Sequence, residues 1–97
     1  MSLPVILSET ALLTFDAIAE QVLQRLGNKA HQDFKKNTLK TLKLISQNPL
    51  IYKQLEFDSN IRIGLIKKIS SVFYEVKQDR IEILFFWDNR QEPMTKP

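Results

Sequence analysis

The sequence predicts a two-layer α+β domain, with the order β-α-α-β-β-β, in which an N-terminal helical hairpin packs on one face of an antiparallel sheet. Three observations support this fold class. Apolar residues recur every three or four positions in the first half of the chain, they are concentrated in short strand-like runs in the second half, and the connections are short. We expect a single domain over residues 1–97, because 97 residues is the usual size of one hydrophobic core.

The first strand is expected to lead directly into the first helix. Residues 4–7 form the short apolar run Pro-Val-Ile-Leu. Ser8 follows as a good N-cap residue, and Glu9 in the first turn favours the helix dipole. Helical spacing then connects the apolar residues Leu12, Phe15, Ala19, Val22 and Leu26. Gly27 is a natural residue to end this helix.

A second helix is expected to start at Asn28, which can serve as its cap, and to end before Asn48 and Pro49. The two-residue connection makes the two helices an αα-hairpin. Most of the basic excess of the first half lies on this helix, at Lys29, Lys35, Lys36, Lys40 and Lys43. Such a run of lysines is usually a solvated face.

Three strands are expected after Pro49, over Ile61–Ile66, Val72–Val76 and Ile81–Trp87. The turns between them are short, and residues 77–80 form a polar one, so the strands should make an antiparallel meander. With the helices on one face of this sheet, the opposite face is left partly open. We expect the functional surface on that face or its rim.

The composition excludes several classes of site. There is no cysteine, which removes disulfides, thiol nucleophiles and cysteine zinc sites, and the one histidine, His31, has no metal-ligand spacing around it. We therefore expect no metal and no cofactor. No apolar run approaches the roughly 20 residues that span a bilayer, so we expect a soluble, cytoplasmic protein with no membrane partner. The net charge of +3 mildly favours an acidic partner.

Several cations lie near the ends of the expected strands. Arg62, Lys67 and Lys68 lie on or just after the first strand of the meander, and Arg90 follows the last. Antiparallel pairing can bring them to one edge or face, where they would bind phosphate or carboxylate groups. The alternative is that each is a solvated or locally paired side chain. Trp87, at the end of the last strand, is either a core residue or a platform on which a base stacks.

The order of these segments resembles the RelE/ParE superfamily of toxins from bacterial type II toxin–antitoxin systems. The resemblance covers nearly the whole chain, and the segments that carry it are Ser8 with the two helices, residues 46–49, the strand start at Ile61 and Arg62, residues 71–76, and residues 83–93. It implies a compact domain, a cognate antitoxin that wraps it, and one of two activities. These are ribosome-dependent mRNA cleavage and poisoning of DNA gyrase.

Three residues match motif positions of this superfamily. Arg62 matches an arginine at the start of the first meander strand, Tyr74 matches the tyrosine of a "Y-x-V" strand, and Arg90 matches an arginine of a closing "H-x-R-R-D-P"-like segment. Two positions differ. Ser71 replaces an arginine found in many members, and Asp88 stands where the closing motif has histidine. No tyrosine follows the last strand, so the chain keeps cations but lacks the usual acid and base of the mRNA-cleaving members.

The resemblance therefore favours a growth-inhibiting toxin that acts by binding an essential target, closer to the gyrase-directed, ParE-like branch. The alternatives are a metal-independent, ribosome-dependent endoribonuclease of the RelE-like branch and an inactive domain that only binds antitoxin. The implied partners are an antitoxin and either DNA gyrase or the ribosome with its mRNA, in a plasmid-stabilisation module. A homodimer or a toxin–antitoxin hetero-oligomer is compatible with either activity. The candidate target-binding residues are Arg62, Lys67, Lys68, Trp87, Asp88 and Arg90.

Overall fold

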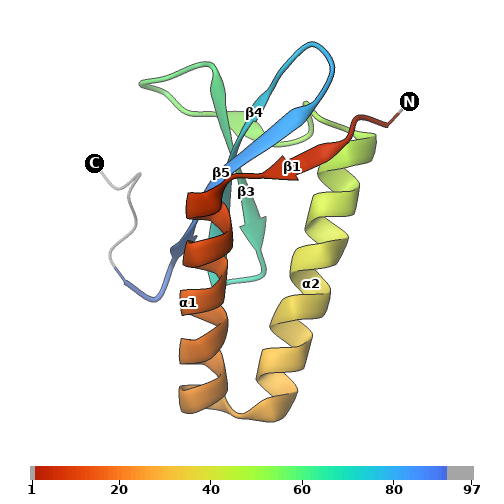
Figure 1. The fold of residues 1–97 in the computed structure, drawn as a ribbon. Coiled ribbons are helices and arrows are strands. Elements are labelled where there is room, and N and C mark those ends of the chain that lie inside the picture. The colour runs from red at the N-terminus through yellow and green to blue at the C-terminus, as the bar shows by residue number, and fades with distance from the viewer. Residues whose placement is uncertain (1, 92–97) are drawn as a thin grey trace.

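A computed structural model describes residues 2–91 and confirms the α+β class, with two helices packed on a five-stranded sheet (Figure 1). The elements are β1 (Val5–Leu7), α1 (Glu9–Leu26), α2 (Asn28–Gln47), β2 (Lys53–Gln54), β3 (Ile61–Ile66), β4 (Ser70–Val76) and β5 (Ile81–Asp88). The three meander strands and both helices lie where the sequence predicts them, with β4 beginning two residues earlier than expected.

The sheet has the strand order β1-β5-β4-β3-β2 and is mixed rather than wholly antiparallel. The meander of β3, β4 and β5 is antiparallel, as predicted. β1 instead pairs in parallel with β5, because the helical hairpin returns the chain to the side of the sheet from which it started. β2 was not expected: its two residues pair antiparallel with β3 and are too few to show an alternating pattern.

The two ends of α1 are fixed by the residues that the sequence indicates. The Ser8 hydroxyl accepts a hydrogen bond from the Ala11 N–H at 3.0 Å and also donates one to the Leu84 carbonyl at 2.8 Å, so this N-cap also ties α1 to β5. Gly27 has a φ of +92°, a conformation that suits glycine. The expected cap at Asn28 is wrong, because Gly27 itself precedes α2 and Asn28 is its first residue.

The core lies between the hairpin and one face of the sheet, where α1 covers β5 and α2 covers β3 (Figure 1). Phe15 of α1 connects three elements, since its ring centroid lies 5.4 Å from that of Phe34 on α2 and 5.5 Å from that of Phe86 on β5. The other large side chains buried here include Val22, Ile45, Ile66, Val72, Tyr74, Ile81 and Ile83. This layer fixes the positions of the strand ends.

The opposite face of the sheet carries a smaller apolar cluster. Phe73 is only 2% exposed there, and its ring stacks on that of Phe85 at a centroid distance of 4.4 Å. Leu65, which is paired with Ser71 across β3 and β4, is 58% exposed. This face is therefore covered in part and open in part, as the two-layer arrangement predicts.

Candidate functional site

The strand register brings the turn between β3 and β4 next to the end of β5. Ser70 at the start of β4 is paired with Asp88 at the end of β5. Immediately beyond this pair, the Asn89 N–H donates a hydrogen bond to the Ile69 carbonyl at 2.8 Å. Lys67 and Lys68 in the turn therefore lie at the same end of the sheet as Asp88 and Arg90, as the antiparallel meander predicts.

We call this region the basic end and define it by five cations. Two of them were not expected from the sequence: Arg25, at the end of α1, lines one hollow with Asp88 and Arg90, and Lys40, on α2, lines another with Lys67. The full set is Arg25, Lys40, Lys67, Lys68 and Arg90. The only signal for Arg25 in the sequence is its place in the last turn of α1, where a cation also favours the helix dipole.

The two turn lysines differ from Lys77, Arg80 and Arg90, each of which forms an ion pair. Both side chains are exposed, and neither forms an ion pair with any residue between 2 and 91. Lys67 has a φ of +53°, which is uncommon for a residue with a Cβ atom. The tight turn that holds it is closed by a hydrogen bond from the Ile69 N–H to the Ile66 carbonyl at 3.2 Å.

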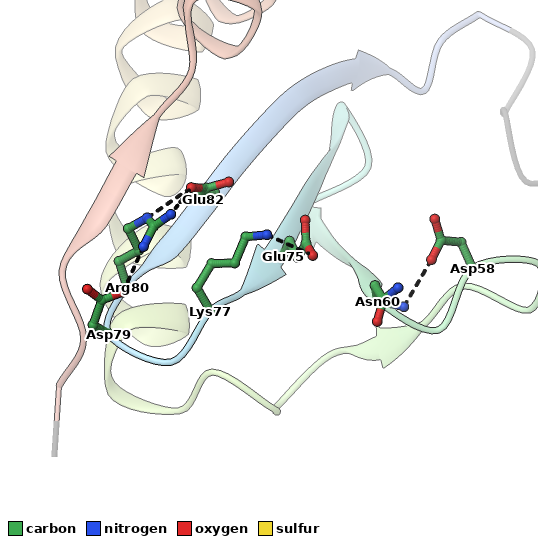
Figure 2. A network of polar contacts seen from close by, with 7 residues as sticks. All are labelled: Asp58, Asn60, Glu75, Lys77, Asp79, Arg80 and Glu82. Atoms are coloured by element: carbon green, nitrogen blue, oxygen red, sulfur yellow. Dashed lines mark hydrogen bonds and ion pairs between the residues drawn. The ribbon is translucent and has the colours of Figure 1, made fainter.

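The opposite end of the sheet shows the contrast (Figure 2). There Lys77 pairs with Glu75 at 3.1 Å, and Arg80 pairs with both Asp79 at 2.8 Å and Glu82 at 2.9 Å. The hydrogen bond to Glu82 is the main reason that the pKa of Arg80 is raised. Lys77 and Arg80 are thus balanced by neighbouring carboxylates, whereas Lys67 and Lys68 at the basic end have no ion-pair partner within residues 2–91.

Asp88 and Arg90 form a tight bidentate pair. The Oδ1 atom of Asp88 accepts from the Arg90 backbone N–H and from Nε, both at 2.9 Å, and its Oδ2 atom accepts from NH2 at 2.7 Å. The side-chain hydrogen bonds lower the pKa of Asp88 and raise that of Arg90, and the nearby charge of Arg25 lowers the pKa of Asp88 further. Asp88 is therefore held as an ion that orients Arg90.

Ser71 and Trp87 lie opposite each other on β4 and β5, next to this pair. Ser71 is 4% exposed, and its hydroxyl donates to the Asn89 Oδ1 atom at 2.9 Å. The position at which the resemblance expects an arginine is thus a small, buried, hydrogen-bonded residue. Trp87 is half-buried and lines the hollow next to Arg90, so it is neither fully in the core nor freely exposed.

Arg62 is separated from the other candidate residues. It lies near the start of β3, at the other end of that strand from Lys67, and its NH1 donates to the Tyr52 carbonyl at 2.7 Å and to the Leu50 carbonyl at 3.5 Å. Tyr74, its partner across β4, is fully buried and donates its hydroxyl to the Pro49 carbonyl at 2.9 Å. Together they fasten residues 49–52 to the sheet.

The contacts of Tyr74 also define its chemistry. Burial raises the pKa of its hydroxyl, although hydrogen bonding and the charge of Arg62 act in the opposite direction. Among residues 2–91, then, the one tyrosine that matches the resemblance is a structural donor and is not accessible to a substrate. Glu92 and Pro93, which belong to the closing segment of the resemblance, lie outside the described residues.

A groove of about 550 Å³ lies beside the basic end, between α1 and the second half of β5. Residues 14–26 of α1 form one wall, and residues 86–91 form the other. No group of three metal-ligating side chains occurs within residues 2–91, and no helix of that region is long and apolar enough to cross a membrane.

No protein-family model matches the sequence, and no curated protein matches it. Solved structures do match in three dimensions. A chain of the chromosomal ParDE toxin–antitoxin system from P. aeruginosa matches with a TM-score of 0.76 and 17% identity, over 90% of this chain and 96% of that one. A chain of the E. coli DinJ-YafQ toxin–antitoxin complex matches with a TM-score of 0.62 and 8% identity, over 95% and 98%. The chain therefore has a RelE/ParE-like toxin fold.

Proposed function

We propose that this protein is the toxin of a type II toxin–antitoxin pair and that it inhibits growth by binding an essential target through its basic end. DNA gyrase, the target of the ParE-like branch, is the leading candidate. An antitoxin would neutralise the toxin by covering apolar surface with an extended or helical segment. The fold is consistent with this assignment, since the matching structures belong to toxin–antitoxin systems.

One observation carries the preference for binding over cleavage: within residues 2–91, the one carboxylate that lines the groove with Arg25 and Arg90 is already engaged by an arginine. Attack by a 2′-hydroxyl needs a base, charge stabilisation at phosphate and a proton donor. That carboxylate, Asp88, is bound bidentately by Arg90, which lowers its pKa. The Tyr74 hydroxyl is buried at the other end of the sheet. This arrangement supports electrostatic docking better than acid–base chemistry.

A RelE-like endoribonuclease is the second candidate, because Lys67 and Lys68 are exposed and free of ion pairs within the described residues. Two adjacent ammonium groups of this kind can position and stabilise a phosphate. A domain that only binds antitoxin is the third. The same experiment separates all three candidates.

The experiment expresses the chain without its partner in a bacterial host. Two readouts run in parallel: mapping of mRNA 5′ ends on translating ribosomes, and detection of DNA breaks trapped by purified gyrase. The proposal expects growth arrest with gyrase-linked breaks. Cleavage clustered in the ribosomal A site would favour the endoribonuclease instead, and normal growth at high expression would favour the inactive domain.

Charge variants then test the surface. The double variant Lys67→Gly with Lys68→Gln removes two charges, and glycine suits the positive φ at position 67. Its matched control is Lys35→Gln with Lys36→Gln, which removes the same charge from exposed positions of α2. We expect the turn variant to weaken growth arrest at equal expression and the control to leave it unchanged. Equal arrest by both variants would exclude the turn from the working surface.

The pair Arg62→Ala with Arg90→Ala tests the arginines that match the resemblance. Arg62 contacts main-chain carbonyls, so its loss is expected to reduce stability, whereas Arg90 lies at the basic end. The single variants therefore have to be compared at equal amounts of folded protein. Loss of arrest in the Arg90 variant alone would assign target binding to Arg90, and undiminished arrest in the double variant would remove both.

A further inference from the structure

A second hollow, of about 240 Å³, lies between α2 and the end of β3. Its walls carry polar and cationic side chains from both sides: Asn37, Lys40 and Thr41 on α2, and Lys67 just after β3. No carboxylate from residues 2–91 lines it. It therefore differs in charge from the groove beside α1, where a carboxylate is paired with an arginine.

The two lysines of this hollow have no counter-ion in the part of the chain that the structure describes. Neither Lys40 nor Lys67 forms an ion pair with any residue between 2 and 91, and both are exposed. Because they come from different elements and line one hollow, their like charges repel each other. An anion bound between them would remove this repulsion.

Neutral hydrogen-bond donors accompany the two ammonium groups. The side chains of Asn37 and Thr41 line the same hollow, and Thr41 is only 9% exposed. An asparagine amide and a threonine hydroxyl can each donate a hydrogen bond. The hollow thus offers donors of two kinds, charged and neutral, to a group that has several acceptor oxygens.

The outer edge of β3 adds a main-chain donor. β2 pairs with only two residues of β3, so no strand among residues 2–91 covers the rest of β3 on that side. The Leu55 N–H, just after β2, donates to the Ile61 carbonyl, so Ile61 directs its main-chain groups away from β4. Alternate residues of a strand share that direction, and Leu65, which lines the hollow, therefore directs its N–H to the same uncovered side.

This set of donors is the one that proteins use to hold phosphate. Contacts to nucleic-acid backbones come from lysine, threonine and asparagine side chains and from main-chain N–H groups. A phosphate presents its acceptor oxygens in several directions, whereas the two oxygens of a carboxylate lie in one plane. The volume of about 240 Å³ is below the roughly 300–1,000 Å³ of pockets that enclose a drug-sized ligand, so the hollow suits one phosphate group better than a whole nucleotide.

We propose that the hollow between α2 and β3 binds a backbone phosphate of a nucleic acid through the ammonium groups of Lys40 and Lys67. A polymer is favoured over a free phosphate because Lys68, next to Lys67, is also exposed and has no ion pair within residues 2–91, so it can bind a neighbouring phosphate of the same strand. The inference rests on the proposed function for the use of the hollow, since its lysines belong to the basic end. It names the chemistry recognised there as a phosphodiester of DNA or RNA.

The test uses the full purified chain and two labelled probes, an RNA strand of about 12 nucleotides and a DNA duplex of about 12 base pairs. Fluorescence anisotropy measures the dissociation constant of each probe at several salt concentrations. The hollow variants are Lys40→Gln and Thr41→Val, and Lys40→Arg keeps the charge. The matched control is Lys35→Gln, which removes one charge from an exposed position of α2 that does not line the hollow.

We expect Lys40→Gln to raise the dissociation constant about threefold to tenfold and to reduce the slope of log affinity against log salt by about 0.7–0.9, the value for one lost phosphate contact. Thr41→Val should raise the constant about threefold without changing the slope, because it removes a donor and no charge. Lys40→Arg and Lys35→Gln should stay within about twofold of wild type. In a nitrogen–proton NMR titration with inorganic phosphate, the Leu65 amide and the Asn37 side-chain amide should shift.

Equal losses of affinity in Lys40→Gln and Lys35→Gln would show that diffuse charge attracts the probes, and would overturn the inference. A hexaglutamate peptide that shifts the Leu65 and Asn37 signals as strongly as phosphate does would also overturn it, because the hollow would then be a carboxylate site. If the inference holds, the probe that the wild-type chain binds more tightly identifies DNA or RNA as the source of the phosphate.

The two proposals fail separately. A chain that arrests growth on expression but binds neither probe would overturn the inference and leave the proposed function in place. A chain that binds a probe through the hollow but does not arrest growth would uphold the inference and contradict the proposed function.

Discussion

Removing the side-chain hydrogen bonds of Tyr74 and Arg62, which fasten residues 49–52 to the sheet, should lower the free energy of unfolding by an amount that can be worked out from the contacts. Tyr74→Phe deletes a fully buried hydroxyl that donates to the Pro49 carbonyl at 2.9 Å. The loss of one such bond costs about 1–2 kcal/mol. Arg62→Met keeps the aliphatic stem but deletes the 2.7 Å bond to the Tyr52 carbonyl, and because this guanidinium is partly exposed we expect about 1 kcal/mol.

The double variant is the sharper measurement. Both bonds hold the same segment, so breaking the first frees carbonyls that the second then holds less effectively. We therefore expect the double variant to lose about 0.5–1 kcal/mol less stability than the sum of the losses in the two single variants. Urea unfolding supplies the free energies, and each 1 kcal/mol corresponds to a fall in Tm of about 4–8 °C for a domain of this size.

Two outcomes would refute this reasoning. Wild-type stability in both single variants would show that water replaces the bonds without cost. Full additivity would show that the two contacts act on independent parts of the connection. Hydrogen exchange supplies the local control: the amides of residues 50–52 should exchange faster in each variant, whereas those at the centre of α1 should change only with global stability.

Three further predictions concern other parts of the fold. Ser8→Ala should lower the free energy of unfolding by about 1–2 kcal/mol, because it removes both the helix cap and the bond to β5, and Ser8→Thr is its control. Asp88→Asn should lower the free energy of unfolding by about 1 kcal/mol at pH 7. Because the folded-state pKa of Asp88 is lowered, the difference in stability from wild type should shrink as the pH falls below about 4. A difference that does not change with pH would contradict a stabilising ion pair. Gly64→Ala should destabilise by about 1–3 kcal/mol, because a Cβ there would lie 2.9 Å from the Tyr52 ring; thermal unfolding equal to wild type would mean that the ring moves aside freely.

The fold was predictable because its signals are local. Ser8 caps α1 through its own side chain, and Gly27 ends that helix because glycine adopts a positive φ readily. The meander strands are consecutive in the sequence and are joined by short turns. The parallel pairing of β1 was not predictable in this way. A three-residue strand carries no mark of its neighbour, which is determined by how the hairpin packs on the sheet.

The candidate site was predictable only in part, because sequence order does not show which way a side chain points. Lys67 and Lys68 lie at the same end of the sheet as Arg90, because antiparallel pairing places the turn between β3 and β4 next to the end of β5. Arg62 lies on a strand of the same meander but near its other end, with its guanidinium on main-chain carbonyls. Arg25 was missed because its proximity to Asp88 depends on how α1 crosses β5.

The pairing of the first strand with the last also constrains how this protein is made. Ser8 bonds to Leu84 and β1 pairs with Ile81–Ile83, so the native sheet cannot close until a nascent chain has been extended by more than 70 residues beyond β1. At typical elongation rates of about 5–20 residues per second, that interval lasts roughly 4–15 s. During this time the helical hairpin can already form from local contacts, but its apolar face is not yet covered by the meander strands. Synthesis itself therefore delays the moment at which the complete five-stranded sheet exists.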